Sequence, residues 1–245
     1  MQFSVLQWNV WFEENIEHIL SFLQNNPADI ICLQELTRGY LKQTQENTWE
    51  YLANQLGYNL HVKEIPVITP EAQWAQGNAI LSKHPIVDTS WVWVHEPISP
   101  EALNDQYRVY IDITLNMQDE QVVIGTTHLL YAPSFADTPA KRHETAKLCD
   151  ILASKTGKFI FTGDLNALPD SQCIQSILRI MQHAGPGFDE KTWTTKPFSY
   201  PDFEATTLDW RMDYIFYKNM QPCEAHIIPT DYSDHLPIRA TFTIL

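Results

Sequence analysis

Long apolar runs are missing from this sequence of 245 residues. No stretch of 18 or more consecutive apolar residues occurs, which excludes a transmembrane helix of ordinary length. The first ten residues, MQFSVLQWNV, contain neither the basic segment nor the apolar core of a signal peptide, and they alternate as a strand does. We therefore expect a cytoplasmic protein without membrane insertion, and we expect a monomer.

Cysteine is scarce and scattered along the chain. Cys32, Cys149, Cys173 and Cys223 lie far apart and form no C-x-x-C pair. This spacing favours free thiols in a reducing compartment over a disulfide framework or a zinc site.

Basic residues are few compared with acidic ones. The chain has 16 Lys and Arg against 30 Asp and Glu, which gives a formal net charge of −14. Proteins that bind nucleic acid through a broad basic surface usually have the opposite sign, so the charge disfavours that class. It does not exclude an enzyme whose bound cation supplies the local attraction.

Internal repeats, low-complexity tracts and linkers are also missing from the sequence, and we expect a single domain over residues 1–245. The apolar periodicity predicts helices over about 16–24, 49–56, 139–153 and 172–181. It predicts strands at about 3–9, 29–35, 58–63, 78–82, 86–94, 107–115, 122–129, 158–164, 213–217, 223–229 and 236–244. Because hairpins separate many of these strands, the pattern indicates a mixed α and β protein and no simple βαβ repeat.

Polar side chains lie at, or just after, these apolar strands in six separate places. They are Asn9, Gln34-Glu35, Thr127-His128, Asp164 with Asn166, Asp213 and Asp234-His235. Each one alone has an ordinary interpretation as a turn, cap or surface residue. Together they are what a site on a rigid sheet scaffold requires. Asp164 and Asn166, two positions apart in FTGDLNALPDS, point to the same side of an extended segment.

The donor types in this set favour a hard divalent cation. Carboxylate and carboxamide oxygens suit Mg²⁺ or Mn²⁺, whereas zinc sites rely on thiolates or several histidines, and no H-E-x-x-H motif occurs. The residues therefore predict a site for Mg²⁺ or Mn²⁺, the kind of cation that phosphoester hydrolysis needs together with an activated water.

The order of the motifs resembles the endonuclease/exonuclease/phosphatase superfamily over residues 3–245. The motifs are LQWNV, IICLQE, GNAILSKHPI, THLLYAP, FTGDLNALPDS, RMDYIF and YSDHLPI. The resemblance implies a fold of the α+β class, a four-layer α/β/β/α sandwich in which two mixed sheets pack face to face. The NVWF segment is similar to that of bacterial members related to tyrosyl-DNA phosphodiesterase.

The resemblance also implies roles for individual residues. Glu35 would be the principal metal ligand beside Asn9, and Asp234 would complete the metal or water network. Asp164 and Asn166 would position and activate the attacking water. His235 would contact the scissile phosphate, with Asp213 orienting its ring, and His128 would bind a phosphate oxygen. The chain departs from many nuclease members at Trp11, where they carry an Asp, so a second metal position is in doubt.

The substrate is the least constrained prediction. DNA or RNA is expected, with Trp193 stacking on bases or packing in the core, and with Arg211 binding phosphate or forming a surface ion pair; Asn78 is a further candidate for substrate binding. A small-molecule or lipid phosphate, of the inositol phosphate or sphingomyelin type, is the alternative substrate. A catalytically silent binding module on the same fold is the third hypothesis. The stretch 184–207 is predicted to be a long loop beside the site.

Overall fold

Two six-stranded sheets form the centre of the protein in the computed structural model, which describes residues 1–68, 73–96, 107–200 and 203–244. The first sheet has the order β13-β14-β1-β2-β4-β3, and the second has the order β5-β6-β7-β8-β12-β9. The first contains β1 (Gln2–Asn9), β2 (Ile30–Arg38), β3 (Asn59–Ile68), β4 (Gln73–Ser82), β13 (Gln221–Ile227) and β14 (Ile238–Thr243). The second contains β5 (Ile86–His95), β6 (Arg108–Met117), β7 (Glu120–His128), β8 (Lys158–Asp164), β9 (Gln182–His183) and β12 (Asp213–Lys218).

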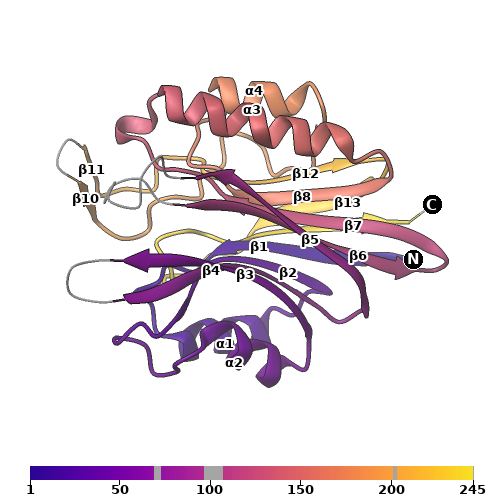
Figure 1. Ribbon diagram of the computed structural model, residues 1–245, viewed down its shortest axis with the longest axis horizontal. Helices are drawn as coiled ribbons and strands as arrows, with labels where there is room; N and C mark the ends of the chain where they lie inside the picture. Colours follow the sequence, from indigo (N-terminus) through magenta and orange to yellow (C-terminus); the bar gives the residue numbers. More distant parts are fainter. Residues whose placement is uncertain (69–72, 97–106, 201–202, 245) are drawn as a thin grey trace.

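Four helices cover the outer faces of the two sheets (Figure 1). They are α1 (Ile16–Asn25), α2 (Thr48–Leu56), α3 (Pro139–Ser154) and α4 (Gln172–Leu178). The first two pack on the first sheet and the other two on the second. The result is the predicted α/β/β/α sandwich, with each sheet mixed because β1–β2 and β7–β8 are parallel pairs among antiparallel neighbours.

The core between the sheets is built from aliphatic side chains of both layers. Val5 and Ile30 of the first sheet lie in one buried cluster with Ile111 and Ile160 of the second. Fully burying a side chain of this size contributes about 1.5–3 kcal/mol. The strands alternate or run continuously apolar because they are covered on both faces, by the partner sheet and by helices.

Some element boundaries differ from those predicted. β3 and β4 extend as a paired ribbon to Ile68 and Gln73, several residues beyond the predicted 58–63 and 78–82. Pro66 interrupts the apolar pattern there, but an edge strand tolerates proline because one row of its backbone donors needs no partner. α4 ends at Leu178, so Met181 lies beyond the helix rather than within it.

The predicted loop 184–207 is partly a hairpin. Strands β10 (Phe198–Tyr200) and β11 (Phe203–Ala205) pair within it, and residues 201–202 lie outside the described part of the chain. A short helical turn, η1 (Pro133–Phe135), follows β7. None of the helices in the described part of the chain is long and apolar enough to cross a membrane.

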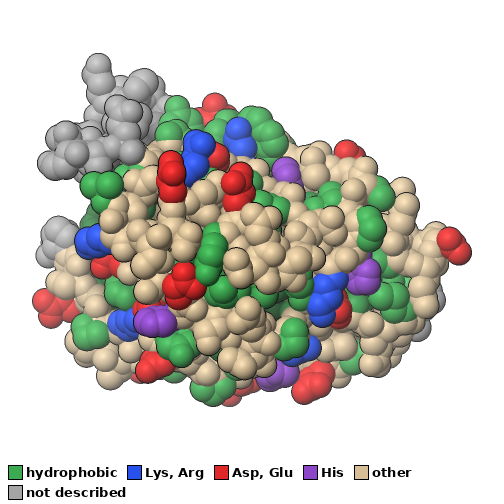
Figure 2. All heavy atoms as spheres, turned by 90° about the horizontal axis from the view of Figure 1, so that it is seen from below, with side chains coloured by type: hydrophobic (Ala, Val, Ile, Leu, Met, Phe, Trp, Pro, Cys, Tyr) green, Lys and Arg blue, Asp and Glu red, His purple; other side chains and the backbone are tan. Residues whose placement is uncertain are grey.

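Charged side chains are mixed on the face of the molecule drawn in Figure 2. There, Lys and Arg lie singly among Asp and Glu, and no broad basic area is visible on that face. On this face, the net charge of −14 is therefore not accompanied by a broad basic patch.

Candidate active site

The strand pairing brings the polar residues at the strand ends together. In the second sheet, the register places His128 opposite Asp164 and Asp164 opposite Asp213, so three functional positions form a row across β7, β8 and β12. In the first sheet, Asn9 at the end of β1 lies opposite Gln34 of β2. These strand ends lie at the end of the sandwich away from both chain termini (Figure 1).

Glu35 reaches the site through an irregularity in β2. The register of β2 against β4 shifts between Leu33 and Leu36, and Glu35 within this bulge has a left-handed backbone with φ of 62°. Such bulges redirect a side chain that regular alternation would send elsewhere. The carboxylate of Glu35 accepts hydrogen bonds from the Asn9 amide at 2.9 Å and from the Phe12 backbone N–H at 3.1 Å.

Asn9 connects the two sheets. Its amide nitrogen donates to Glu35 Oε1 and to Asp164 Oδ2, each at 2.9 Å. Because one nitrogen contacts both oxygens, the carboxylates of Glu35 and Asp164 lie in the same small volume although they come from different sheets. The convergence expected from the strand ends is therefore present for these three residues.

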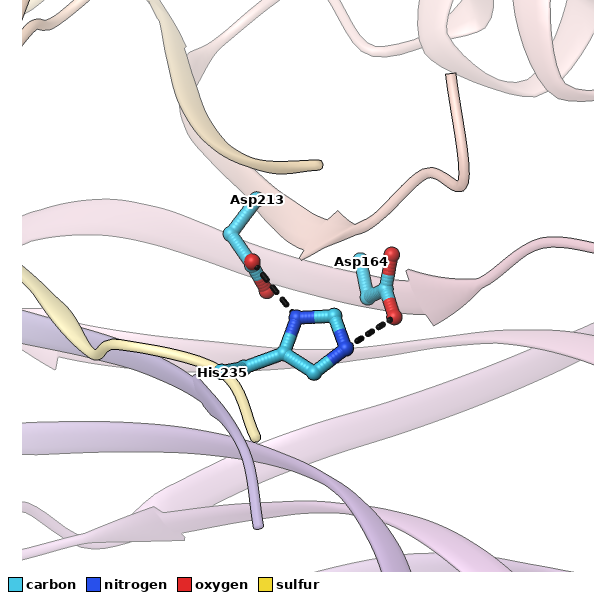
Figure 3. A group of neighbouring side chains, drawn as sticks. All are labelled: Asp164, Asp213 and His235. Atoms are coloured by element: carbon cyan, nitrogen blue, oxygen red, sulfur yellow. Dashed lines mark hydrogen bonds and ion pairs between the residues drawn. The ribbon is translucent and has the colours of Figure 1, made fainter. Parts of the chain in front are cut away.

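In Figure 3, His235 lies between Asp213, with which it shares a hydrogen bond, and Asp164, with which it forms an ion pair. Nδ1 of His235 lies 2.8 Å from Asp213 Oδ2, and Nε2 of the same ring lies 3.5 Å from Asp164 Oδ2. The ligand atoms of these three buried residues all lie within 4.8 Å of one another, so the group can hold a metal ion. Because Asp213 accepts at Nδ1, the ring presents Nε2 toward Asp164 and the cavity.

A buried polar network supports Asp213 from behind. Gln7 lies 3.5 Å from Asp213 Oδ1 and exchanges hydrogen bonds with Gln34, whose amide donates to Thr126 at 2.9 Å. On the other side, the hydroxyl of Thr192 accepts from the Asp213 backbone N–H at 3.2 Å. A carboxylate with these neighbours has little freedom to rotate away from the imidazole.

Electrostatics keeps His235 protonated and His128 neutral. Burial opposes the charge of His235, but the surrounding carboxylates of Asp213, Asp164 and Asp234 hold its pKa well above the ordinary value. Burial lowers the pKa of His128 well below its ordinary value, and the nearby cations, Arg108 first, lower it further. Two histidines a few ångströms apart thus carry different charges.

Both ring nitrogens of His128 face polar groups of the site. The amide nitrogen of Asn166 donates to the Leu129 carbonyl at 3.0 Å and lies 3.1 Å from His128 Nε2, which is also 3.4 Å from Asp164 Oδ2. Nδ1 of the same ring lies 3.9 Å from Glu35 Oε1. The backbone N–H of Asn166 donates to Asp164 Oδ1 at 3.0 Å and fixes that carboxylate as well.

The carboxylates are crowded enough to favour a cation. Burial and the Asp234 carboxylate raise the pKa of Glu35 to about 7, and burial raises the pKa of Asp164 to about 6 against the opposing effect of His235. Like charges brought together in a buried site resist ionisation unless a positive charge is added. The donors are hard oxygens, which fits a divalent cation of the Mg²⁺ or Mn²⁺ kind.

Residues 6–235 match the endonuclease/exonuclease/phosphatase family, a span that covers most of the sequence. The chain belongs to this family. It is accordingly a hydrolase of phosphoester bonds, and its buried Asp and His cluster lies where the family motifs converge. No curated protein matches the sequence significantly.

Solved structures share the fold at low sequence identity. An endonuclease/exonuclease/phosphatase from Beutenbergia cavernae superposes with a TM-score of 0.77 at 18% identity, over 98% of this chain and 71% of the other. D. rerio TDP2, complexed with a single-strand DNA product, has a TM-score of 0.67 at 18% identity, covering 99% of both chains. A mannosyl-6-phosphatase of Bacteroides thetaiotaomicron has a TM-score of 0.66 at 14% identity, covering 99% of this chain and 100% of the other. These likenesses confirm the fold and leave the substrate open.

The phosphoesterase site opens into a cavity of about 320 Å³. Its polar floor contains Glu35, Arg108, His128, Asp164, Asn166, Asp234 and His235. Trp193 also lines it, and the indole N–H of this residue donates to Asp234 Oδ2 at 2.9 Å. Trp193 is thus both packed, with 5% of its surface exposed, and in contact with the site.

Two candidates for substrate binding lie away from this cavity. Arg211 is completely buried, and its guanidinium donates to the backbone carbonyls of Pro186, Gly187, Glu190 and Asp213. Arg211 is therefore neither a phosphate ligand nor part of a surface ion pair, the two roles predicted for it. It fixes the segment that precedes Trp193. The amide of buried Asn78 donates to the Val109 carbonyl at 2.9 Å and connects the two sheets.

Arg108 is a site residue that the strand-end pattern did not reveal. It begins β6 and is 93% buried, with Glu144, Glu35 and Asp164 as its acidic neighbours. In the sequence, Arg108 is one of the polar positions of the alternating segment 107–115, so the pattern gave no reason to separate it from an ordinary outward-facing strand residue. The hairpin register offers the missing signal, since Tyr110 pairs with Thr127 and residue 108 therefore lies beside the end of β7.

Proposed function

We propose that the protein is a Mg²⁺- or Mn²⁺-dependent phosphodiesterase that acts on DNA or RNA. The observation that carries the proposal is the convergence of the Asp213–His235–Asp164 row with Glu35 through the single amide of Asn9. An acid–base group, an imidazolium and a carboxylate pair suited to a cation thus share one cavity. We further propose, from the composition, a cytoplasmic monomer.

We place the ion beside Glu35, with Asn9 and Asp234 near it, although the Asp164–Asp213–His235 group can also hold a metal. Nδ1 of His235 already contacts Asp213, and a charged imidazole is a poor metal ligand because both nitrogens carry protons. A bound divalent cation would neutralise negative charge on the non-bridging oxygens of the phosphate.

The protein groups have complementary tasks in hydrolysis. Asp164, held by the Asn9 amide and the Asn166 backbone, is placed to accept a proton from the attacking water. The protonated Nε2 of His235 donates to an oxygen of the scissile phosphate, and Asp213, which accepts from Nδ1, stabilises the charged ring. Arg108 adds a permanent positive charge at the cavity floor. We assign a phosphate oxygen to His128 as a hydrogen-bond partner.

A small-molecule phosphate is the second candidate substrate. It is favoured by the net charge of −14 and by the single arginine among the described residues that line the cavity. The structural similarity to a mannosyl-6-phosphatase is compatible with it. A silent binding module is disfavoured, because such a module does not need a charged His235 between two buried carboxylates.

The deciding experiment is a panel of phosphoesters incubated with Mg²⁺ or Mn²⁺ and, separately, with chelator. It includes single-stranded, duplex and abasic DNA, a 5′-phosphotyrosyl oligonucleotide, RNA, sphingomyelin, inositol phosphates and a sugar phosphate. We expect metal-dependent cleavage of one or more nucleic acids. Turnover confined to the monoesters would replace the proposal with the phosphatase, and no turnover of any substrate would support the silent module.

A further inference from the structure

Aromatic rings flank the polar floor of the cavity in two separate groups. Phe12 and Trp74 line it from the first sheet, where their ring centroids lie 5.5 Å apart. We call this pair, together with Tyr40 packed 4.7 Å from Trp74, the Trp74 wall. Tyr131, Phe198 and Tyr200 line the cavity from the segments after β7 and from β10, and we call them the Tyr200 wall.

The two walls belong to different layers of the sandwich. Trp74 lies on β4, and Phe12 follows β1, both in the first sheet. Tyr131 follows β7 of the second sheet, and the β10–β11 hairpin projects at the same end of the molecule on that side (Figure 1). The cavity lies between them, so a ligand on the polar floor has rings available on either side.

The rings of the Tyr200 wall pack against one another, and Tyr200 remains exposed to solvent. Phe198 and Tyr200 are nearly parallel, with 4° between their planes, and Tyr131 contacts Tyr200 edge-on at 5.5 Å. Tyr200 nevertheless leaves 48% of its surface exposed. A large aromatic ring exposed at the mouth of a polar cavity is a surface for another flat ring, because stacking removes apolar area from water.

Positive charge along this cavity is limited. Arg108 is the single Lys or Arg among the described residues that line it, and all 16 Lys and Arg of the chain belong to the described part. Cations near the rim are already paired: Arg38 with Glu64, and Lys196 with Glu14 at 2.6 Å. A substrate with many phosphates would find few partners here.

We propose that the site selects a phosphodiester of low charge that carries an unpaired planar ring on each side of the scissile phosphorus, as a dinucleotide or a short single-stranded oligonucleotide does. This inference rests on the proposed phosphodiesterase function. One ring stacks in the Trp74 wall and the other in the Tyr200 wall. Water adds its oxygen to phosphorus, the P–O bond to one ring-bearing half breaks, and the leaving oxygen takes up a proton. Duplex bases are already stacked and cannot enter.

Two chromogenic diesters test the walls separately. Bis(4-nitrophenyl) phosphate and methyl 4-nitrophenyl phosphate have the same charge and the same leaving group, but the second lacks one ring. We expect Trp74→Ala and Tyr200→Ala each to raise KM for the first ester by about 5- to 150-fold, the range of ring-stacking losses on alanine substitution. With the methyl ester, one of the two variants should have no effect. Trp91→Ala, an equally exposed ring on β5 outside the cavity, is the matched control and should change neither KM.

Oligonucleotides provide the second arm. A single-stranded tetranucleotide should be cleaved at least 10-fold faster than an abasic one with the same phosphates, and faster than a duplex containing it. Between 50 and 200 mM salt, kcat/KM should fall only about 2- to 3-fold, as expected for one phosphate contact. Two results would overturn the inference even if the enzyme turns over its substrates. One is an equal rise in KM for both esters in both wall variants, and the other is equal cleavage of the normal and the abasic tetranucleotide. Absence of turnover by the unmodified enzyme would instead overturn the proposed function.

Discussion

Three residues around the site adopt a left-handed backbone that side chains other than glycine rarely take. They are Trp11, Glu35 and Asn166, with φ of 57°, 62° and 43°. The turn at Trp11 directs two backbone N–H groups inward, from Trp11 to the Asn9 side chain and from Phe12 to Glu35. Such strain, of the order of 1–3 kcal/mol per residue, persists where the surrounding contacts demand it, and at this site it fixes the ligand oxygens before substrate arrives.

At the same scale, Asp164→Asn tests the water-activating group. The substitution keeps the shape of the side chain and removes its ability to accept a proton, so we expect turnover to fall roughly 10²- to 10⁴-fold with the fold intact. Asp170→Asn, an exposed carboxylate of the same loop, is the control and should retain activity. Full activity in a folded Asp164→Asn protein would show that the assignment to Asp164 is wrong.

His235 and Asp213 give the pH dependence. Because His235 must be charged to donate to phosphate, activity is lost as pH rises through its pKa, which Asp213 helps to hold above the ordinary value. Asp213→Asn removes that charge, so the pKa of His235 should fall and the alkaline limb of kcat/KM should move to lower pH. The measurement is kcat/KM against pH for both proteins. A lower rate with an unmoved alkaline limb would mean that Asp213 does not control the protonation of His235.

At the scale of elements, a buried ion pair on α3 joins the loops that follow β7 and β8. The ammonium of Lys141 donates to the carbonyls of Leu130 and Leu165 at 2.8 and 2.7 Å, and the Glu144 carboxylate accepts from the Leu130 N–H. Since His128 and Asp164 end these two strands, α3 determines how far apart the loops stand.

Lys141→Met should therefore destabilise the protein, because it removes the ion pair with Glu144. It removes the cation 3.7 Å from the fully buried Glu144 together with the two hydrogen bonds of that ammonium, and we expect a loss of about 3–5 kcal/mol in the free energy of unfolding. Lys147→Met on the same helix removes only a surface pair with Glu96, and its effect should stay within about 0.5 kcal/mol. Urea unfolding compares them; equal losses would argue against the bracing role of Lys141.

The sequence predicts some strands accurately and misses features that depend on long-range pairing. Strands with continuous apolar runs, such as 158–164, were predicted to within a residue because burial on two faces fixes their composition. The paired extension of β3 and β4 was missed because it contains Pro66 and little alternation, and the bulge at Glu35 depends on register against β4, a long-range property. Arg211 was misread because its partners are backbone carbonyls, which have no side-chain signature.

At the scale of the whole molecule, both sheets contribute acidic side chains to the place where the two layers meet. The first sheet contributes Glu35 and the second contributes Asp164, and both are buried where the layers meet. Closing the sandwich therefore brings like charges together. The cation that we propose beside Glu35 would therefore stabilise the interface between the sheets as well as prepare the site for phosphate.

This linkage predicts how stability depends on pH and metal. The folded-state pKa values of Glu35, about 7, and Asp164, about 6, lie above their ordinary values of 4.5 and 3.8, so the folded protein without metal holds more protons than the unfolded chain. Its free energy of unfolding should therefore decrease as pH rises from about 4 to 7, by of the order of 3 kcal/mol for Glu35 alone. Mg²⁺ competes with those protons, so the gain in Tm on adding Mg²⁺ to chelator-treated protein should grow over the same pH range. Glu35→Gln should remove about half of the pH dependence, because the pKa of Asp164 is raised by a similar amount, and it should remove most of the metal-induced gain in Tm. A metal-induced gain in Tm that is equal at pH 5 and pH 8 would contradict the placement of the ion at Glu35.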